Sequence, residues 1–499
     1  MFIKKPLNII TAMKNLPSLH RKTLEVDFYK PTLLVFCMCL VYWIYLICAA
    51  QIEIKHDAIG YEQLGTMLYK QGWVEYFRTG PNREPIYPFL ISISMRTADG
   101  LSISYHLIQK IIQVALLFAT QILVFFILRK IKIKPLLEAV ILLYVGFSPA
   151  IINAAFSLFS EIASYPFVPG IIIASALSWR SIHSDTRRSL SFSALAAFLF
   201  AMATFSRGVF YYIYYVFLIP FIVLMVVSFV KEKRRACINS IISIISAVVV
   251  FHLCIIPYKW MNKIYNGQYE ITDRSVRLLY GNASKRARPL TSRVLLAHLA
   301  SIPGSGVCQM FFNYDECKYC EFQVVDGIHS RELPPLLTEV PIGQVNKKIV
   351  KITTQLVFKH PFQYVTFMFI EGARLFFWES TRIGNVIYPV WLQNLFEYRL
   401  FKDPLRLLVS LMSIFGFIYL FIYVSQNITK VFSALADDCL IYSFFILLMI
   451  ILYIGCYSLF STVTRYALPI APLNLISIAL LCEQVMVEKK QINKFSHKT

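Results

Sequence analysis

Three acidic residues occupy positions where carboxylates could carry out acid–base chemistry. Asp57 comes soon after the first long apolar stretch, Glu84 lies in the Pro-flanked segment 80–88, and Glu161 stands at a short predicted turn. Carboxylates close to a lipid bilayer cost free energy and are often functional. Each could instead cap a helix or be solvated at the membrane surface. Because all three are predicted on one side of the membrane, we expect them to act together in catalysis.

Two arginines lie in short turns on the same predicted side as the acids. Arg207 follows Ser206, and Arg465 precedes Tyr466. Both could extend toward lipid headgroups, but a guanidinium also offers a bidentate fork that fits a phosphate. We therefore predict that Arg207 and Arg465 bind an anionic substrate group. The basic stretch 274–293 could bind a further anion or simply face water.

Three of the eleven cysteines fall in a polar region of the chain. A structural zinc site would need four ligands at recognisable spacing, whereas Cys308, Cys317 and Cys320 supply one C-x-x-C pair and a third thiol. One disulfide closing a local loop, with one thiol left over, is the favoured interpretation. Three reduced thiols remain open as the alternative.

The composition limits which elements can position these residues. Of 499 residues, 57% are hydrophobic and 15% are charged, against about 25% charged in soluble chains. Several apolar stretches reach the roughly 20 residues that cross a bilayer, and basic clusters separate them. The 15% of aromatic residues excludes disorder, and neither a fixed repeat nor a nucleic-acid-binding face is visible. The sequence predicts an all-α polytopic membrane protein that binds no nucleic acid.

Ten spans are predicted, and their sidedness follows from the basic residues. The N-terminal segment and the tail with Lys498 are rich in lysine, and the clusters 129–134, 187–188 and 231–235 all fall on the same predicted side. Cytosolic loops collect Lys and Arg, so both termini are expected in the cytosol. The predicted spans are 31–50, 105–128, 135–152, 161–179, 190–205, 209–230, 238–258, 405–424, 439–460 and 467–482.

Three modules are expected along the chain. Residues 1–258 form an N-terminal transmembrane module whose first external loop, 51–104, carries the catalytic acids. Residues 259–404 form an external domain, and 405–499 form a C-terminal transmembrane module with a cytosolic tail. The piece 361–379 is apolar but contains Glu371 and Arg374. It is interpreted as an interfacial or re-entrant helix, because a full span would invert everything after it.

The order of these features resembles the polyprenyl-phosphate-sugar-dependent glycosyltransferases of the GT-C fold. That family includes the protein O-mannosyltransferases and the aminoarabinose transferases of lipid A. The resemblance covers the layout of the whole chain. It rests on an acid after the first span, a Glu84-Pro85-x-Tyr87-Pro88 segment, an acid at the second external turn, a large loop after the seventh span and a closing Arg465-Tyr466-x-x-Pro469-x-x-Pro472.

The resemblance implies a GT-C-like bundle of about ten (roughly 10–13) transmembrane helices and a role for each candidate. Asp57 would act as base or organise the site, and Glu84 and Glu161 would line the cavity. The donor phosphate would be bound by Arg207, Arg465 and Tyr466, and the substrate cavity would include Tyr61, Arg83 and Tyr87. A divalent metal ion is left open as a cofactor, with Asp57 and Glu161 as candidate ligands.

The implied reaction moves a sugar from a polyprenyl-phosphate donor to a lipid, glycan or protein acceptor, with inversion at the anomeric carbon. The protein is expected in the inner (plasma) membrane of a bacterium, with its active site facing outside. No P-loop or G-x-G-x-x-G is present, and a lipid-linked donor needs none. Where the protein mannosyltransferases show an Asp-Glu pair, this chain has Asp57-Ala58, which favours the bacterial lipid-donor branch.

Two other functions remain open. An envelope polysaccharide polymerase or ligase would depend on external arginines, such as Arg277, and histidines more than on acids in the first external loop. A lipid or solute transporter should show inverted repeats or broken helices near the middle of the membrane, and neither is evident from the sequence.

Overall fold

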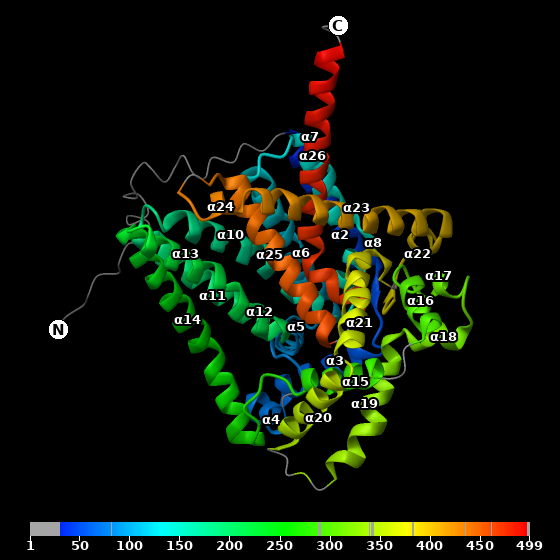
Figure 1. Cartoon of the computed structure of the whole chain (residues 1–499). Coiled ribbons are helices and arrows are strands. Elements are labelled where there is room, and N and C mark those ends of the chain that lie inside the picture. The colour runs from blue at the N-terminus through cyan, green and yellow to red at the C-terminus, as the bar shows by residue number, and fades with distance from the viewer. Residues whose placement is uncertain are drawn as a thin grey trace, which may run out of the picture.

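The computed structural model of the chain describes residues 30–80, 82–287, 291–338, 340, 344–381, 384–434, 436–460 and 462–496. The lysine-rich segment 1–29 and Lys498, used above to assign sidedness, lie outside these residues. Within them the fold is almost entirely helical, with one two-stranded sheet (Figure 1). This confirms the prediction of an all-α polytopic membrane protein.

Nine helices of the described chain are long and apolar enough to cross a membrane, and one bent pair raises the number to ten. They coincide with the ten predicted spans. The nine are Lys30–Ala49 (α2), Tyr105–Lys130 (α6), Glu161–Ser181 (α9 and α10), Thr186–Ser206 (α11), Val209–Val230 (α12 and α13), Arg234–Asn266 (α14), Arg399–Gln426 (α23), Asp438–Phe460 (α25) and Thr464–Glu488 (η4 and α26). The composite spans divide into α9 (Glu161–Ser164), α10 (Phe167–Ser181), α12 (Val209–Phe217), α13 (Ile219–Val230), η4 (Thr464–Ile470) and α26 (Ala471–Ser496).

The bent pair consists of α7 (Pro135–Phe147) and α8 (Pro149–Phe156), which meet at 44°. Pro149 cannot donate a backbone hydrogen bond, so the helix breaks before it. The buried carboxylate of Glu379 fills the break, accepting hydrogen bonds from Ser148 Oγ at 2.7 Å and from the Ala150 N–H at 3.3 Å. The Ser148 hydroxyl and the Ala150 N–H exposed by the break therefore find a hydrogen-bond acceptor within the protein. Burial raises the pKa of Glu379 to about 7.

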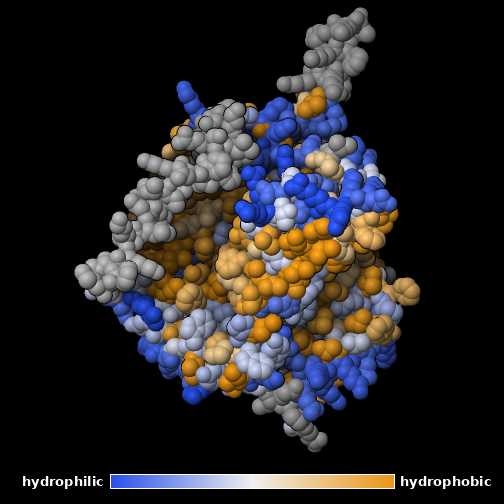
Figure 2. Space-filling view, turned by 90° about the vertical axis from the view of Figure 1, so that its left-hand side faces the viewer, coloured by the Kyte–Doolittle hydropathy of each residue, from blue (hydrophilic) through white to orange (hydrophobic). Residues whose placement is uncertain are grey.

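The outer faces of the spans are apolar. On α13 and α14 the exposed side chains include Ile222, Phe229, Ile245 and Leu253. Figure 2 shows hydrophobic residues across the middle of this face, with hydrophilic residues above and below them. Such a face is expected to contact lipid in a protein with this many apolar spans, since a soluble protein rarely exposes so large an apolar area.

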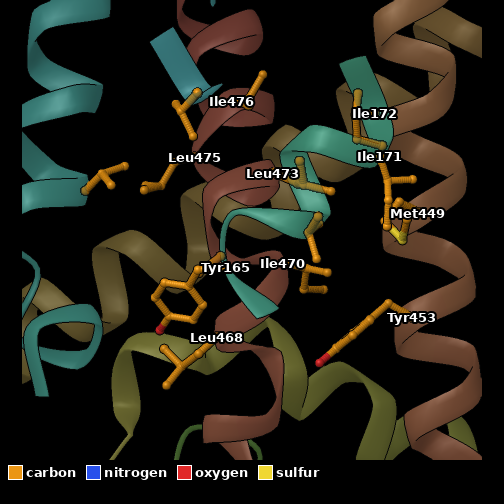
Figure 3. Close-up of a cluster of buried hydrophobic side chains, with 14 of the residues drawn as sticks. Tyr165, Ile171, Ile172, Met449, Tyr453, Leu468, Ile470, Leu473, Leu475 and Ile476 are labelled. Carbon is orange, nitrogen blue, oxygen red and sulfur yellow. The ribbon is translucent and has the colours of Figure 1, made fainter. Parts of the chain in front are cut away.

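The spans pack closely in the interior. Tyr165, Ile171, Met449 and Ile470 bring α10, α25 and the last span together in one buried cluster (Figure 3). Elsewhere α23 crosses α26 at Gly416, where a Cβ would come within 2.9 Å of the α26 backbone. Small residues at such crossings allow membrane helices to approach one another.

Helices that do not span the membrane fill two connections. After α2 come strand β1 (Gln51–Ile52), α3 (Asp57–Lys70), α4 (Gly72–Arg78) and α5 (Ile86–Leu101). Between α14 and α23 lie α15 (Arg274–Arg286), α16 (Ser292–Ala300), α17 (Ser305–Cys308), α18 (Tyr314–Tyr319), α19 (Phe322–Leu337), α20 (Val345–Lys359), α21 (Pro361–Ala373), η3 (Arg374–Ser380), β2 (Val386–Ile387) and α22 (Val390–Glu397). Short α24 (Ile428–Val431) follows α23.

The region between α14 and α23 begins later than the boundary predicted at 258, because α14 continues to Asn266. A disulfide joins Cys308 to Cys317 and leaves Cys320 as a buried thiol, which confirms the favoured cysteine interpretation. Helix α21 is not among the helices able to span a membrane. It packs along α25, with the Tyr364 hydroxyl donating to the carbonyl of Leu459 at 3.0 Å.

Candidate functional site

The start of α3 fixes the position of Asp57. The ammonium group of Lys110 donates to the carbonyls of Ile47 and Ala50 and so satisfies the end of α2, where a cation is favourable. Strand β1 then pairs antiparallel with β2, with Gln51 opposite Ile387. The chain leaves this short sheet and enters α3 at Asp57. The segment that leads from α2 to Asp57 is therefore fixed by Lys110 at its start and by the pairing of β1 with β2 further along.

Asp57 is surrounded by three arginines. Its Oδ1 lies 2.8 Å from Nη2 of Arg83 and 3.8 Å from Nη2 of Arg274, and its Oδ2 accepts a hydrogen bond from Arg465. Burial raises the pKa of Asp57, but the charges of Arg465, Arg83 and Arg274 outweigh this effect and hold it well below the ordinary range. About a fifth of the Asp57 side chain is exposed, at 20%. The carboxylate is ionised and accessible from the cavity.

A second ion pair lies deeper. Glu161, at the start of α9, is 2.9 Å from Nη1 of Arg207 and 3.6 Å from Nε of Arg465. Arg207 Nε also donates to the Tyr457 hydroxyl at 2.8 Å, and its guanidinium lies 4.8 Å from the centre of the Tyr466 ring. Arg465 therefore stands between the two carboxylates, whereas the buried Arg207 pairs with Glu161 and Tyr457.

Glu84, Arg83 and Tyr61 connect these ion pairs to neighbouring turns of the chain. The carboxylate of Glu84 accepts a hydrogen bond from the Gly208 N–H at 2.8 Å. Arg83 lies over the ring of Tyr61 at 4.4 Å, and the Tyr61 hydroxyl donates to Ser160 Oγ at 2.8 Å. These contacts join the first connection to the turns before α9 and α12.

A cavity of about 720 Å³, counting its open mouth, brings these groups together. Eight of the nine residues proposed from the sequence line it, and Tyr87 does not. Tyr87 is wholly buried behind Tyr61, with ring centres 5.1 Å apart, and its hydroxyl donates to the carbonyl of Ser157. The lining residues are Asp57, Tyr61, Arg83, Glu84, Phe159, Ser160, Glu161, Arg207, Gly208, Val209, Tyr212, Arg274, Ser275, Leu278, Tyr457, Phe460, Arg465 and Tyr466.

Sequence reasoning missed the contribution of α15. Arg274, Ser275 and Leu278 from its first turns line the cavity. Arg274 was only one member of a basic stretch in the sequence, and no signal separated it from Arg277. In the structure Arg277 pairs with Asp273 at 2.9 Å, outside the cavity lining.

A divalent ion does not fit the residues present. Arg83 and Arg465 hold the two oxygens of Asp57, and Arg207 holds Oε1 of Glu161, so guanidinium groups already occupy three of the four carboxylate oxygens that a metal would need. Ca²⁺ and Mg²⁺ require several oxygen ligands around one point. In the part of the chain that the structure describes, no group of three or more His, Cys, Asp or Glu is placed to hold a metal. The arginines themselves supply the positive charge here.

No protein-family model and no curated protein matches the chain. Among solved structures it is similar to the archaeal oligosaccharyltransferase AglB from Archaeoglobus fulgidus, determined in complex with an inhibitory peptide and a dolichol-phosphate. The TM-score is 0.46 at 11% sequence identity, and the match covers 94% of this chain and 52% of that chain. The chain thus spans about half the length of that protein, and a likeness this weak carries no argument about activity.

Proposed function

We propose that the protein is a membrane glycosyltransferase of the GT-C type that uses a polyprenyl-phosphate sugar as donor. The observation that carries this proposal is the cavity itself. It gathers the accessible carboxylate of Asp57 and four arginines, two of which, Arg207 and Arg465, lie at the ends of membrane-spanning helices. A carboxylate and a cluster of guanidinium groups are the two elements that transfer from a lipid phosphate to a hydroxyl requires.

In the proposed reaction Asp57 accepts the proton of an acceptor hydroxyl. The acceptor oxygen forms a bond to the anomeric carbon from the side opposite the phosphate, and the carbon–phosphate-oxygen bond breaks with its electron pair left on the phosphate. Arg274 and Arg465 stabilise the developing charge on that oxygen. The configuration at the anomeric carbon is inverted.

The apolar rim of the cavity suits a lipid-linked donor. Tyr212 of α12 and Phe460 of α25 both line the cavity, and their ring centres are 5.3 Å apart. Tyr212 is 41% exposed, and its helix is part of the membrane span Val209–Val230. A polyprenyl chain leaving the cavity past these two rings would enter the lipid directly, and its phosphate would remain beside the arginines.

We place the cavity on the outer face of the membrane because the basic clusters 129–134, 187–188 and 231–235 all lie at the opposite ends of the spans. A membrane-impermeant thiol reagent applied to intact cells tests this. A cysteine at Met310, which is 75% exposed, should be labelled, and a cysteine at Lys430 should be protected. Labelling at Lys430 would contradict this topology.

The direct test is transfer by the purified protein in nanodiscs, with a panel of polyprenyl-phosphate sugars and release of the lipid phosphate as readout. Mass spectrometry of envelope glycans and lipids, with and without the protein, would identify the acceptor. A polymerase or ligase that depends on Arg277 should be impaired by Arg277→Ala and tolerate Asp57→Ala. The opposite result is expected here, because Asp57 lies in the cavity and Arg277 does not. If no member of the panel is turned over, this proposal is wrong.

A further inference from the structure

Asp57 has two roles that conflict. As the proposed base it must accept a proton, yet Arg83 and Arg465 hold both of its oxygens and Arg274 lies close to the first. A carboxylate bound in this way is a weak base, because each cation favours its charged form. The same arginines are the ones that a donor phosphate would need. The carboxylate and the phosphate therefore compete for them.

The three arginines differ in how firmly they are held. Arg83 lies over the Tyr61 ring and has 16% of its side chain exposed. Arg274 is the most loosely bound, at 3.8 Å from Asp57 with 35% of its side chain exposed. Arg465 is shared with Glu161 and would keep that partner after leaving Asp57. Arg274 and Arg465 can therefore change partner at the lowest cost.

The net charge of the cavity favours the binding of an anion that carries one negative charge. Its lining holds four arginines (Arg83, Arg207, Arg274 and Arg465) against three carboxylates (Asp57, Glu84 and Glu161), which leaves one positive charge over. A sugar phosphodiester carries one negative charge and balances it. After transfer the released lipid phosphate monoester carries nearly two negative charges at neutral pH, and a protonated Asp57 again balances the cavity.

We propose that the donor phosphate replaces Asp57 as the partner of Arg274 and Arg465, and that this exchange makes the carboxylate available as the base. The inference rests on the proposed function. With this exchange, Asp57 becomes an effective base only when the donor is bound. Without the donor, Asp57 stays bound to cations and does not activate water or other hydroxyls.

The exchange predicts that removing a negative charge from Asp57 strengthens the binding of a lipid phosphate. The affinity for decaprenyl phosphate, measured with the protein in nanodiscs, tests this. Asp57→Asn removes the competing charge, so it should bind the lipid phosphate roughly 10–100-fold more tightly than the wild type, as expected for charge-assisted contacts. Glu84→Gln is the matched control, because it removes the same net charge from the same cavity without freeing an arginine from an ion pair. Its gain should not exceed about threefold.

The dependence on Arg274 completes the test as a double-mutant cycle. In an Arg274→Gln background the gain from Asp57→Asn should shrink at least about threefold, whereas in an Arg277→Gln background it should persist. Equal gains for Asp57→Asn and Glu84→Gln, or a gain that does not depend on Arg274, would overturn the exchange. Wild-type protein that does not bind decaprenyl phosphate would instead reject the proposed function, and the exchange with it. Thermal unfolding of each variant verifies that it is folded.

Discussion

Two carboxylates in this protein are each surrounded by cationic side chains, but they differ in their access to solvent. Asp57 lies in the cavity with a fifth of its side chain exposed. Glu371 of α21 is sealed, with 2% of its side chain exposed, and binds Lys285 Nζ at 3.0 Å and Arg286 Nη2 at 2.6 Å. We call Glu371, Lys285 and Arg286 the Glu371 cluster. Similar ion pairs therefore occur in two environments, one that a substrate can enter and one that it cannot.

Because they differ in access to solvent, Asp57 and the Glu371 cluster are expected to have different roles. The Glu371 cluster joins α15 to α21, and Arg286 also donates to the carbonyl of Ser458 near the end of α25 at 2.6 Å. It fixes the last turn of α15, while the first turn of the same helix carries Arg274 into the cavity. A sealed ion cluster can only position structure, whereas an accessible one can exchange its partners. Breaking each group should accordingly produce a different defect.

The largest effect is expected at Asp57. Asp57→Asn keeps the shape of the side chain but cannot accept a full proton, so transfer should fall by about 10²–10⁴-fold. The loss should appear in kcat and leave the KM for donor unchanged or lower. Steady-state transfer measurements on the purified variant verify this. Near wild-type kcat would remove Asp57 as the base and leave it a role in holding the arginines.

Disrupting the Glu371 cluster should instead lower the folding stability of the protein. Glu371→Gln leaves Lys285 and Arg286 buried beside a neutral amide, and breaking a buried pair in this way costs about 3–5 kcal/mol. We expect a clear drop in the thermal unfolding midpoint in detergent, which Asp57→Asn should not show. An unchanged midpoint in Glu371→Gln would mean that the cluster does not hold α15.

A smaller effect separates two arginines on one helix. Arg274→Gln should raise the KM for the lipid donor about tenfold or more, since a charge-assisted contact to phosphate is lost. Arg277→Gln, three residues further along α15 and paired with Asp273, should change it little. Equal effects of the two substitutions would indicate a general role of positive charge on α15.

The smallest effect concerns another carboxylate, that of the buried Glu379, whose pKa is raised by burial from its ordinary value of 4.5 to about 7. A raised pKa means that the folded state holds the proton more tightly than the unfolded state does, so stability is greatest below pH 4.5 and falls as pH rises toward 7. Glu379→Gln should flatten this dependence. Unfolding midpoints of both proteins across that pH range provide the measurement. The dependence of Glu371 has the opposite sign, because cations lower its pKa.

The spans were predictable from the sequence because their signal is local. Hydropathy alone located all ten, and the basic clusters served only to predict their sidedness. The cysteines that could form a disulfide outside the spans were likewise limited to three within 13 residues of chain, 308–320. The roles of Arg207 and Arg274 could not be read in this way. Arg207 was predicted to bind the donor phosphate, and nothing in the sequence indicated that it also pairs with Glu161 and Tyr457. Arg274 lines the cavity from the first turn of α15, and the last turn of that helix is bound by Glu371, which lies far along the chain.

The pairing of Asp57 with Arg465 also has a consequence for the making of the protein. The two residues are 408 positions apart, and β1 needs β2, which is likewise made late. At a synthesis rate of about 5–20 residues per second, Asp57 emerges roughly 20–80 s before its distant partner exists. During that interval the first spans can already be inserted while the site is incomplete. A chain interrupted anywhere before η4 therefore lacks Arg465 and cannot complete the ion pairs around Asp57.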